Sequence, residues 1–367
     1  MINLYKIKDI GNFFGGLTGK SKEDFNIGNA KFVSYMTVFS NPQLPDSIND
    51  TVLISENEKQ NKIKKGDILF TGSSETPDEC GMSCVVTQDI DDDIYLNSFC
   101  FGLRLNNKEI ANPAYLSHYF RSNYARKQIK KTANGVTRFN ISKKKFSEIE
   151  IVIPPIKVQE EIVKILDSFT NLIDALNEEL ALRQKQFEYY REKLLTFDDN
   201  TNMQKICNFA TIQSGKNKER TDNGQFPLFG STGLISRTNI SVYEGDYILI
   251  ARVGANAGFT YRVNGKFDVS DNTLIVTIIK NNTINIDYLY HCLIEQNLNK
   301  YAKGGGQPLV TSGELKNISI PIPSLAVQQS IVEKLEAFES LISSLKEEIA
   351  LRQKQYEYYR EKLLTFD

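Results

Sequence analysis

Two long stretches of the chain carry apolar residues at alternating spacings of three and four, separated by charged and amide residues. The first series is Leu166, Phe169, Ile173, Leu176, Leu180, Phe187, Tyr190 and Leu194, with Arg183 in one further slot, and the second is Leu335, Phe338, Ile342, Leu345, Ile349, Arg352, Tyr356, Tyr359 and Leu363. This period is that of a coiled-coil seam. Neither stretch contains Gly or Pro, so each predicts one helix of about 39 residues, roughly 58 Å long.

The two predicted helices are copies of one sequence. LRQKQFEYYREKLLTFD at 182–198 returns as LRQKQYEYYREKLLTFD at 351–367, and Phe187 against Tyr356 is the sole difference. Extended backward, 149–198 aligns with 318–367 without a gap, and 32 of 50 positions are identical. A seam constrains only two or three positions in each heptad, so the repeated charged faces indicate a surface used twice, by two copies of one partner. The predicted partner-binding residues are Arg183, Glu188, Tyr189 and Arg191, with Arg352, Glu357, Tyr358 and Arg360.

The segments that precede the two copies share a frame rather than a sequence. Both contain a Gly-Asp before a strand-like run (KKGDILF and YEGDYIL), a helical segment with Tyr-Leu, and a glycine-bearing loop (ANGVTRFNISKKKFSEI and AKGGGQPLVTSGELKNI). We expect a mixed α/β (α+β) fold in which two long helices, packed as an antiparallel coiled coil, separate two globular domains with pseudo-two-fold symmetry. The predicted domains are 1–148, 149–198, 199–317 and 318–367, of which the second and fourth hold the helices.

Charge is unevenly distributed along the chain. The formal net charge is −1, yet Arg121 to Lys145 holds nine basic residues and no acidic one. A positive stripe supplies sequence-independent affinity for nucleic-acid phosphates, and Arg, Asn, Gln, Ser and Thr on loops read base edges. The candidates for DNA binding in the first half are Lys130, Lys131, Arg138, Asn140, Lys143, Lys144 and Lys145, with Ser73, Ser74 and Thr76 as weaker ones. Those in the second half are Arg252, Asn256, Lys303 and Gln307.

Motifs that could carry chemistry depart from their templates. GGLTGKS at 15–21 lacks the glycine spacing of a phosphate-binding loop. Cys80 and Cys84 have no further ligands close in sequence, so no metal is expected. Asn112-Pro113-Ala114-Tyr115 is similar to the adenine-holding motif of amino-methyltransferases, but we find no glycine-rich cofactor loop before it; a helix start capped by Asn, with Pro in the first turn, is simpler. We therefore expect no catalytic site and no bound cofactor.

The composition is that of a globular protein, with 41% hydrophobic and 24% charged residues. No apolar run approaches the roughly 20 residues that cross a bilayer, and MINLYKIKDIGN lacks the apolar core of a signal peptide. Five cysteines without a framework spacing fit a reducing compartment. We expect a cytoplasmic protein with no membrane partner.

The end of each variable half is where the chain resembles a known family. GVTRFNISKKKFSEIEIVIPPIKVQEEIV and GGGQPLVTSGELKNISIPIPSLAVQQSIV combine a glycine loop, a Ser/Thr turn, an Ile-x-Ile-Pro strand and a Gln-containing helix start. The pattern resembles the specificity subunit of type I restriction-modification enzymes over the whole chain. The resemblance implies that 1–148 and 199–317 are target recognition domains, each reading half of a bipartite, asymmetric site in double-stranded DNA.

The resemblance also implies partners. Two modification subunits, which methylate adenine with S-adenosylmethionine, would dock on the helices, and ATP-dependent restriction subunits would join for cleavage, while this chain does no chemistry. Two alternatives stay open at this stage. The chain could be an adenine methyltransferase acting through 112–115, or a coiled-coil scaffold that binds no DNA.

Overall fold

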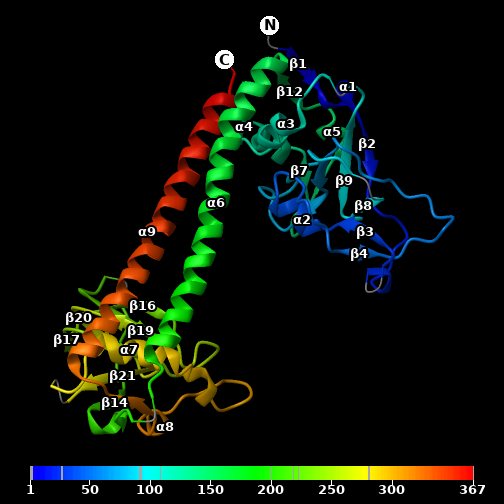
Figure 1. Ribbon diagram of the computed structural model, residues 1–367. Helices are drawn as coiled ribbons and strands as arrows, with labels where there is room; N and C mark the ends of the chain where they lie inside the picture. The colour runs from blue at the N-terminus through cyan, green and yellow to red at the C-terminus, as the bar shows by residue number, and fades with distance from the viewer. Residues whose placement is uncertain are drawn as a thin grey trace. The chain divides into compact units, whose positions relative to one another are not determined.

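The computed structural model describes residues 3–25, 28–90, 93–107, 109–198, 200–217, 219–221, 223–279 and 282–366 (Figure 1). The contacts divide the chain into two units. Unit 1 is Met1–Leu176 with Glu348–Asp367, and unit 2 is Asn177–Glu347. The boundary between the units crosses two 40-residue helices, α6 (Ile156–Leu195) and α9 (Leu325–Leu364). Unit 1 therefore contains the start of α6 and the end of α9, and unit 2 contains the end of α6 and the start of α9.

Unit 1 is built on a four-stranded antiparallel sheet in the order β2-β9-β5-β7. Its strands are β2 (Gly11–Gly15), β9 (Cys100–Leu105), β5 (Ile68–Thr71) and β7 (Ser83–Val85). Beside it lie a sheet of β4 (Thr51–Val52), β3 (Ala30–Val33) and β8 (Ile94–Leu96), a sheet of β10 (Ala133–Asn134), β11 (Phe139–Ile141) and β6 (Ser73–Ser74), and the pair of β1 (Asn3–Lys6) with β12 (Glu150–Ile153). The short helices are α1 (Ile7–Ile10), α2 (Tyr35–Ser40), α3 (Pro113–Phe120), α4 (Asn123–Lys130) and α5 (Lys143–Phe146), with a 3-10 turn at Glu23–Phe25.

Unit 2 repeats this frame. Its main sheet runs β14-β21-β18-β19, from β14 (Ala210–Ser214), β21 (Thr273–Ile278), β18 (Tyr247–Ala251) and β19 (Thr260–Val263). A second sheet holds β16 (Gly233–Thr238), β15 (Phe226–Gly230), β20 (Lys266–Val269) and β17 (Tyr243–Glu244), and β13 (Met203–Lys205) pairs with β22 (Ser319–Pro321) as β1 pairs with β12. The helices are α7 (Ile286–Glu295) and α8 (Ser312–Leu315), with 3-10 turns at Ile206–Asn208 and Leu298–Tyr301. Both units place one parallel strand pair in their second sheet, β3 with β8 and β15 with β20.

The ends of α6 and α9 pack antiparallel inside each unit. In unit 1 the rings of Phe169 and Tyr359 stack with centroids 5.3 Å apart, and in unit 2 the rings of Tyr190 and Phe338 stack at 5.4 Å. These are the same two positions of the repeat with the roles of the helices exchanged. The predicted coiled-coil seam is therefore confirmed, and each end of it repeats the contacts of the other.

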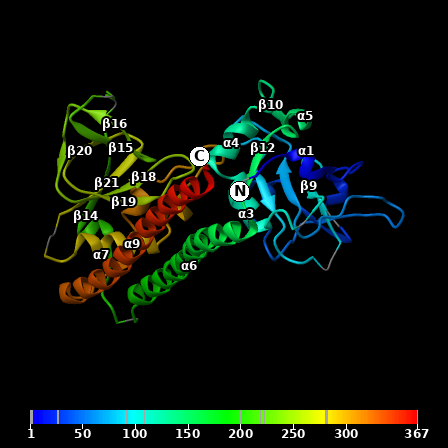
Figure 2. The ribbon, with the colours of Figure 1, turned by 90° about the horizontal axis from the view of Figure 1, so that it is seen from above.

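A buried glutamine joins each arm to the globular part of its own unit. The Gln159 side chain accepts from the backbone N–H of Asn112 at 2.7 Å and donates to the carbonyl oxygen of Pro154 at 2.7 Å. Gln328 repeats this with the backbone N–H of Asn285 at 2.8 Å and the carbonyl of Pro323 at 2.9 Å. Figure 2 shows the result, α3 against the start of α6 and α7 against the start of α9. Because buried amides need all their partners, these bonds orient α3 on α6 and α7 on α9.

Candidate nucleic-acid interface

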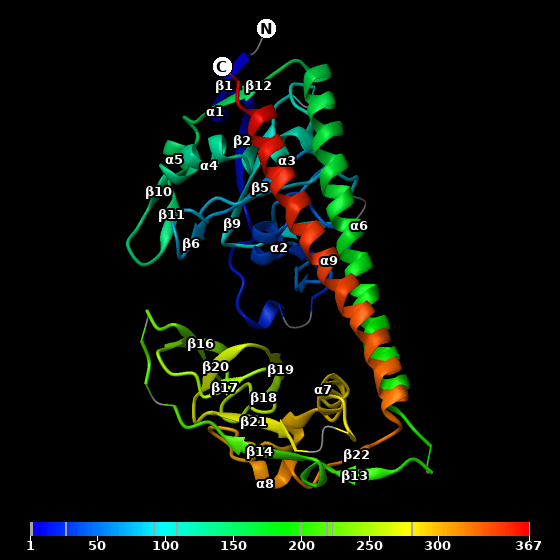
Figure 3. The same cartoon turned by 90° about the vertical axis from the view of Figure 1, so that its left-hand side faces the viewer.

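A β-hairpin in unit 1 gathers several residues that the sequence analysis singled out. The strands β10 and β11 form the hairpin, and β11 pairs with β6 so that Asn140 faces Ser73 and Phe139 faces Ser74. The hairpin extends beside β6 and α5 at one side of the unit (Figure 3). The sheet thus brings together residues 65 positions apart in sequence, from Ser73 to Arg138, around one surface hollow of about 450 Å³.

Arg138 is held in this hollow by a hydroxyl group and an aromatic ring. Its Nε and Nη2 donate to the Ser73 hydroxyl at 3.3 and 3.1 Å, and its guanidinium lies 5.2 Å from the ring centroid of Phe99. Phe99 is 56% exposed, although an aromatic residue before a strand reads as core in the sequence. No sequence pattern identifies Phe99 as part of this site, because only the packing shows that its ring supports an arginine. Tyr35, Met36 and Phe39 form the apolar wall, and Glu75 and Glu79 supply carboxylates at the rim.

The basic stretch serves two purposes in the structure. Arg121 donates to the carbonyl oxygens of Ser83, Val38 and Phe39, and burial lowers its pKa to about 10. Arg126 is used in the same way, with its pKa also lowered to about 10 by burial. Arg121 thus joins α2 to β7, and Arg126 holds the loop before β7, so neither takes part in a cationic stripe at the surface.

The lysines of the stretch stay at the surface. Lys143, Lys144 and Lys145 are exposed on α5, where Lys145 Nζ donates to the Asn134 side chain at 3.3 Å and Lys143 Nζ lies 5.3 Å from the Phe101 ring. Lys131 is exposed, and Lys130 is paired with Asp78 at 2.6 Å. The Thr76 hydroxyl donates to Glu79, on the rim of the hollow. Contact of these side chains with DNA stays a prediction.

Unit 2 places its candidates around the corresponding loop. Val310 donates its backbone N–H to the Arg252 carbonyl, and Gly254 donates to the Pro308 carbonyl, so the segment with Arg252 lies against 303–309. The Arg252 guanidinium donates to the Ser214 hydroxyl at 3.2 Å. Lys303 is paired with Glu314 at 2.5 Å, Gln307 is exposed, and Asn256 lines a hollow of about 440 Å³.

Comparison with known proteins decides the family. The family model of the type I restriction modification DNA specificity domain matches the chain twice, at residues 2–182 and 199–351. The chain belongs to the type I specificity subunit family. A putative type I restriction enzyme specificity subunit of Haemophilus influenzae is 34% identical over 295 residues, which is 71% of this chain and 74% of that relative.

Other members and solved structures agree with this assignment. The EcoprrI specificity subunit of Escherichia coli is 30% identical over 204 residues, and the chain spans only 50% of it. A putative type I specificity subunit of Mycoplasma pneumoniae is 26% identical over 387 residues, covering 100% of this chain and 98% of the relative. The S subunit structure from M. genitalium superimposes with a TM-score of 0.60 at 16% identity, covering 100% of this chain and 97% of that one, which establishes the fold.

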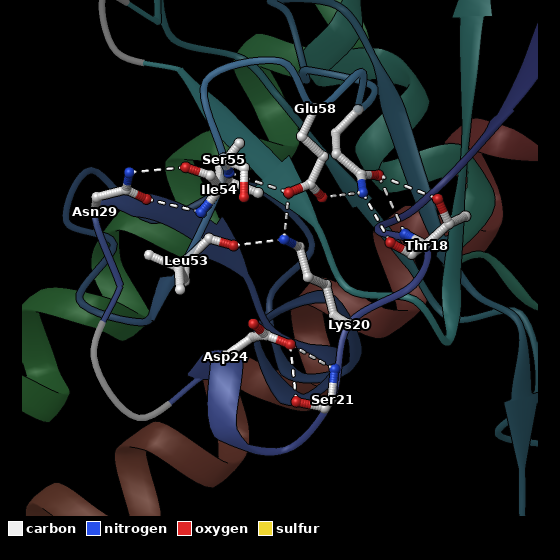
Figure 4. Close-up of polar contacts among 10 residues, drawn as sticks. Thr18, Lys20, Ser21, Asp24, Asn29, Leu53, Ile54, Ser55 and Glu58 are labelled. Carbon is white, nitrogen blue, oxygen red and sulfur yellow. Dashed lines mark hydrogen bonds and ion pairs between the residues drawn. The ribbon is translucent and has the colours of Figure 1, made fainter.

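The sequence motifs that resemble catalytic or ligand-binding motifs have structural roles in this specificity subunit. In the GGLTGKS segment, Lys20 Nζ donates to Glu58 and to the Leu53 carbonyl, both at 2.6 Å, so its ammonium is committed to a loop contact (Figure 4). The bond from Lys20, with further bonds from Gln60 and the Ser55 backbone, lowers the pKa of Glu58 to about 2. Asp24 holds Ser21 in the same cluster (Figure 4). Lys20 thus joins its own loop to the segment 53–58 and has a structural role.

The Asn-Pro-Ala-Tyr segment starts a helix, as predicted. Asn112 caps α3 by accepting from the Ala114 N–H at 2.8 Å, and Pro113 is in the first turn. Tyr115 is fully buried and donates to the Val152 carbonyl at 3.0 Å, so its ring is not available to stack on a base. Cys80 and Cys84 are buried free thiols, and the described residues contain no His, Cys, Asp and Glu group suited to a metal ion.

The repeated outer face of α6 and α9 divides into exposed and buried members. Tyr189 and Tyr358 are 57% and 60% exposed, each with a lysine ammonium 5.8 Å from its ring, from Lys193 and Lys362. Glu188 and Glu357 are exposed beside them. Arg183 and Arg352 are half-buried and bridge within their helices to Glu179 and Glu348.

Arg191 and Arg360 differ from what the repeat suggested. Their side chains are only 19% and 15% exposed and pair with Glu295 and Glu361. Both were predicted to lie on an outer face, because a helical repeat does not show which flank packs against the globular part. The surface that a partner can reach on both arms is therefore centred on the tyrosines.

Among the described helices, none combines the length and the apolar character that crossing a membrane requires.

Proposed function

We propose that this specificity subunit reads a bipartite DNA site, with the hairpin side of unit 1 on one half and the corresponding side of unit 2 on the other. The observation that carries the proposal is that both units have the same strand order in the main sheet and a loop closed by backbone pairing at the same place, Asn134 with Asn140 and Lys303 with Leu309, but different side chains on that loop. A common frame with divergent loops is suited to two different half-sites. Exposed lysines on α5 would add sequence-independent affinity for phosphates.

The chain itself would be a reader without catalysis. The family is one of DNA specificity subunits, and Tyr115 is buried in a core, which speaks against the methyltransferase interpretation. We place S-adenosylmethionine and ATP on modification and restriction subunits, with this chain holding neither. Such a complex would act on DNA in the cytoplasm.

The arms would be the docking surface for two modification subunits. The exposed tyrosine with its lysine and glutamate neighbours occurs once near the end of α6 and once near the end of α9, in identical sequence surroundings. A structure from a type I system is described in terms of complex assembly, and its fold matches this chain with a TM-score of 0.61. Two equivalent surfaces support two copies of one partner.

The experiment is to co-express the chain with a cognate modification subunit in a methylation-free host and map methylated adenines genome-wide. A motif of two parts separated by a fixed unread gap is expected. If the complex assembles and no new methylation appears, the scaffold interpretation is favoured. Binding of S-adenosylmethionine by the purified chain alone would instead favour the methyltransferase interpretation.

A further inference from the structure

The hairpin of unit 1 and the loop 303–309 of unit 2 correspond in their backbone pairing. Asn134 pairs with Asn140 in unit 1, and Lys303 pairs with Leu309 in unit 2, each across five intervening residues. The second paired residue of each loop also pairs with the segment that follows an inner strand of the main sheet, Asn140 with Ser73 after β5 and Leu309 with Val253 after β18. The correspondence is therefore set by backbone pairing and does not depend on sequence similarity.

The first of the intervening residues in each loop is a glycine, because the backbone there has a positive φ. Gly135 has φ +145° and Gly304 has φ +108°, a region that L side chains rarely adopt. A Cβ on Gly135 would meet the Arg138 carbonyl oxygen at 2.0 Å, and one on Gly304 would meet the Gln307 carbonyl oxygen at 3.1 Å. Both glycines thus let the chain pass close to the backbone carbonyl of the residue three positions later, which lies two residues before the second paired residue.

The residue three positions after this glycine differs between the units. Arg138 and Gln307 occupy the same place in their loops, and both are exposed. Among the described residues the Arg138 guanidinium hydrogen-bonds only the hydroxyl of Ser73, through Nε and Nη2, which leaves the edge formed by Nη1 and the second N–H of Nη2 for a ligand. In contrast, Arg104 of the same unit is neutralised by Asp67 at 2.6 Å.

These two side chains have different partners in the DNA major groove. An arginine matches the O6 and N7 acceptors of guanine with two parallel N–H donors. A glutamine amide donates to N7 and accepts from N6 of adenine. Phe99 restricts the Arg138 side chain by covering one face of the guanidinium, and such preorganisation lowers the entropy lost on binding.

We infer that Arg138 reads a guanine in the half-site of unit 1 and that Gln307 reads an adenine at the corresponding place in the half-site of unit 2. The inference rests on the proposed function and adds to it the reading residue of each unit and the base that it reads. It also implies that exchanging the side chains at positions 138 and 307 exchanges the preferred bases, because the backbone around these positions is common to both loops.

The test uses the complex of the full chain with its modification subunit. Methylation motifs are mapped for the unchanged complex and for Arg138→Ala, Arg138→Gln and Gln307→Arg, with thermal unfolding to show that each variant folds. Arg220→Gln is the matched control, because it removes the same charge from an exposed arginine outside both loops. The control is expected to keep the motif.

The expected result is local to one half-site. Arg138→Ala should relax one guanine, reducing discrimination there roughly ten- to hundred-fold, and leave the other half-site unchanged. Arg138→Gln should shift that position toward adenine, and Gln307→Arg should shift one position of the other half-site toward guanine.

Two results would overturn the inference while the proposed function stands. The first is a bipartite motif that keeps all its bases in every variant. The second is uniform weakening on all sequences with a salt dependence reduced by about one counterion, which would make Arg138 a phosphate contact. Failure of the unchanged complex to show any bipartite motif is a failure of the proposed function itself.

Discussion

The hydroxyl of Tyr356 lies 3.0 Å from Nδ1 of His118, in the core of unit 1. The other ring nitrogen, Nε2, is 2.7 Å from an Asp167 carboxylate oxygen. In the neutral tautomer that carries its proton on Nε2, the carboxylate accepts from Nε2–H and Nδ1 accepts from the tyrosine. Burial raises the pKa of Tyr356, which favours its hydroxyl as the donor. Tyr356 is also the only position at which the 17-residue repeats differ, so this bond explains the difference.

Unit 2 lacks this bond at the equivalent place. His291 is fully buried against Phe187, with ring centroids 6.4 Å apart, and neither ring nitrogen has a hydrogen-bond partner among the described residues. The residue that corresponds to Asp167 is Glu336, which is turned to Arg262. His118 therefore has polar partners in Tyr356 and Asp167, whereas the equivalent residues of unit 2, Phe187 and Glu336, do not hydrogen-bond His291.

Tyr356→Phe should destabilise unit 1 by about 1–3 kcal/mol, because it leaves a buried imidazole acceptor unpaired. The free energy of unfolding by urea measures the loss. Tyr359→Phe is the control, since Tyr359 makes a stacking contact that the change preserves. Equal losses in the two variants would show that the hydrogen bond is not the cause.

Phe187→Tyr should stabilise unit 2 by about 0.5–1.5 kcal/mol, because it offers His291 the partner that His118 already has. The chain has two histidines, so their side-chain NMR signals can be assigned by single substitutions. The His291 signal should move toward that of His118 in the variant. A loss of stability instead would show that the site has no room for the hydroxyl.

The pH dependence of unit 2 should carry a contribution from His291. Burial, followed by the nearby Arg262 and Arg191 charges, lowers its pKa from 6.5 to about 4. The unfolded chain therefore binds a proton between these values that the folded chain does not bind, so the stability is fully present above pH 6.5 and falls as the pH is lowered toward 4, by about 3 kcal/mol. NMR titration of the two histidines checks this, and a His291 midpoint near 6.5 in the folded chain would contradict it.

The two exposed tyrosines on the arms should each support one modification subunit. Tyr358→Ala and Tyr189→Ala should each reduce the assembled complex to one such subunit, and the double variant should retain none, as native mass spectrometry would show. Large exposed aromatic residues at an interface commonly contribute 2 kcal/mol or more, roughly. Leu4→Ala is the control, because Leu4 is as exposed but lies on β1. Full assembly of the double variant would refute the assignment of this surface.

The length of α6 and α9 should set the gap between half-sites. Deletion of Leu176–Leu182 together with Leu345–Leu351 removes one heptad from each helix and preserves the seam. Each arm loses about 10 Å, which corresponds to about 3 base pairs. Mapping of methylated adenines gives the new gap, and an unchanged gap would exclude the arms as a spacer.

The helices, their pairing and the duplicated frame could be predicted from sequence, because each depends on a period or on a repeat. The seam of α6 and α9 follows from a three-four spacing that only one helical face can satisfy. The start of α3 follows from Asn112 and Pro113, whose chemistry is local. The family followed from the combined pattern at the end of each half.

The tertiary structure alone decided which polar groups meet. Arg138 and Ser73 are brought together by the pairing of β11 with β6, and no sequence period links them. Arg121, Arg126 and Arg191 look like surface cations in the sequence but lie inward, because their carbonyl contacts and ion pair depend on the packing of distant segments. The repeat by itself established that one position differs, Phe187 against Tyr356, whereas only the fold placed His118 beside that hydroxyl and gave the difference its physical reason.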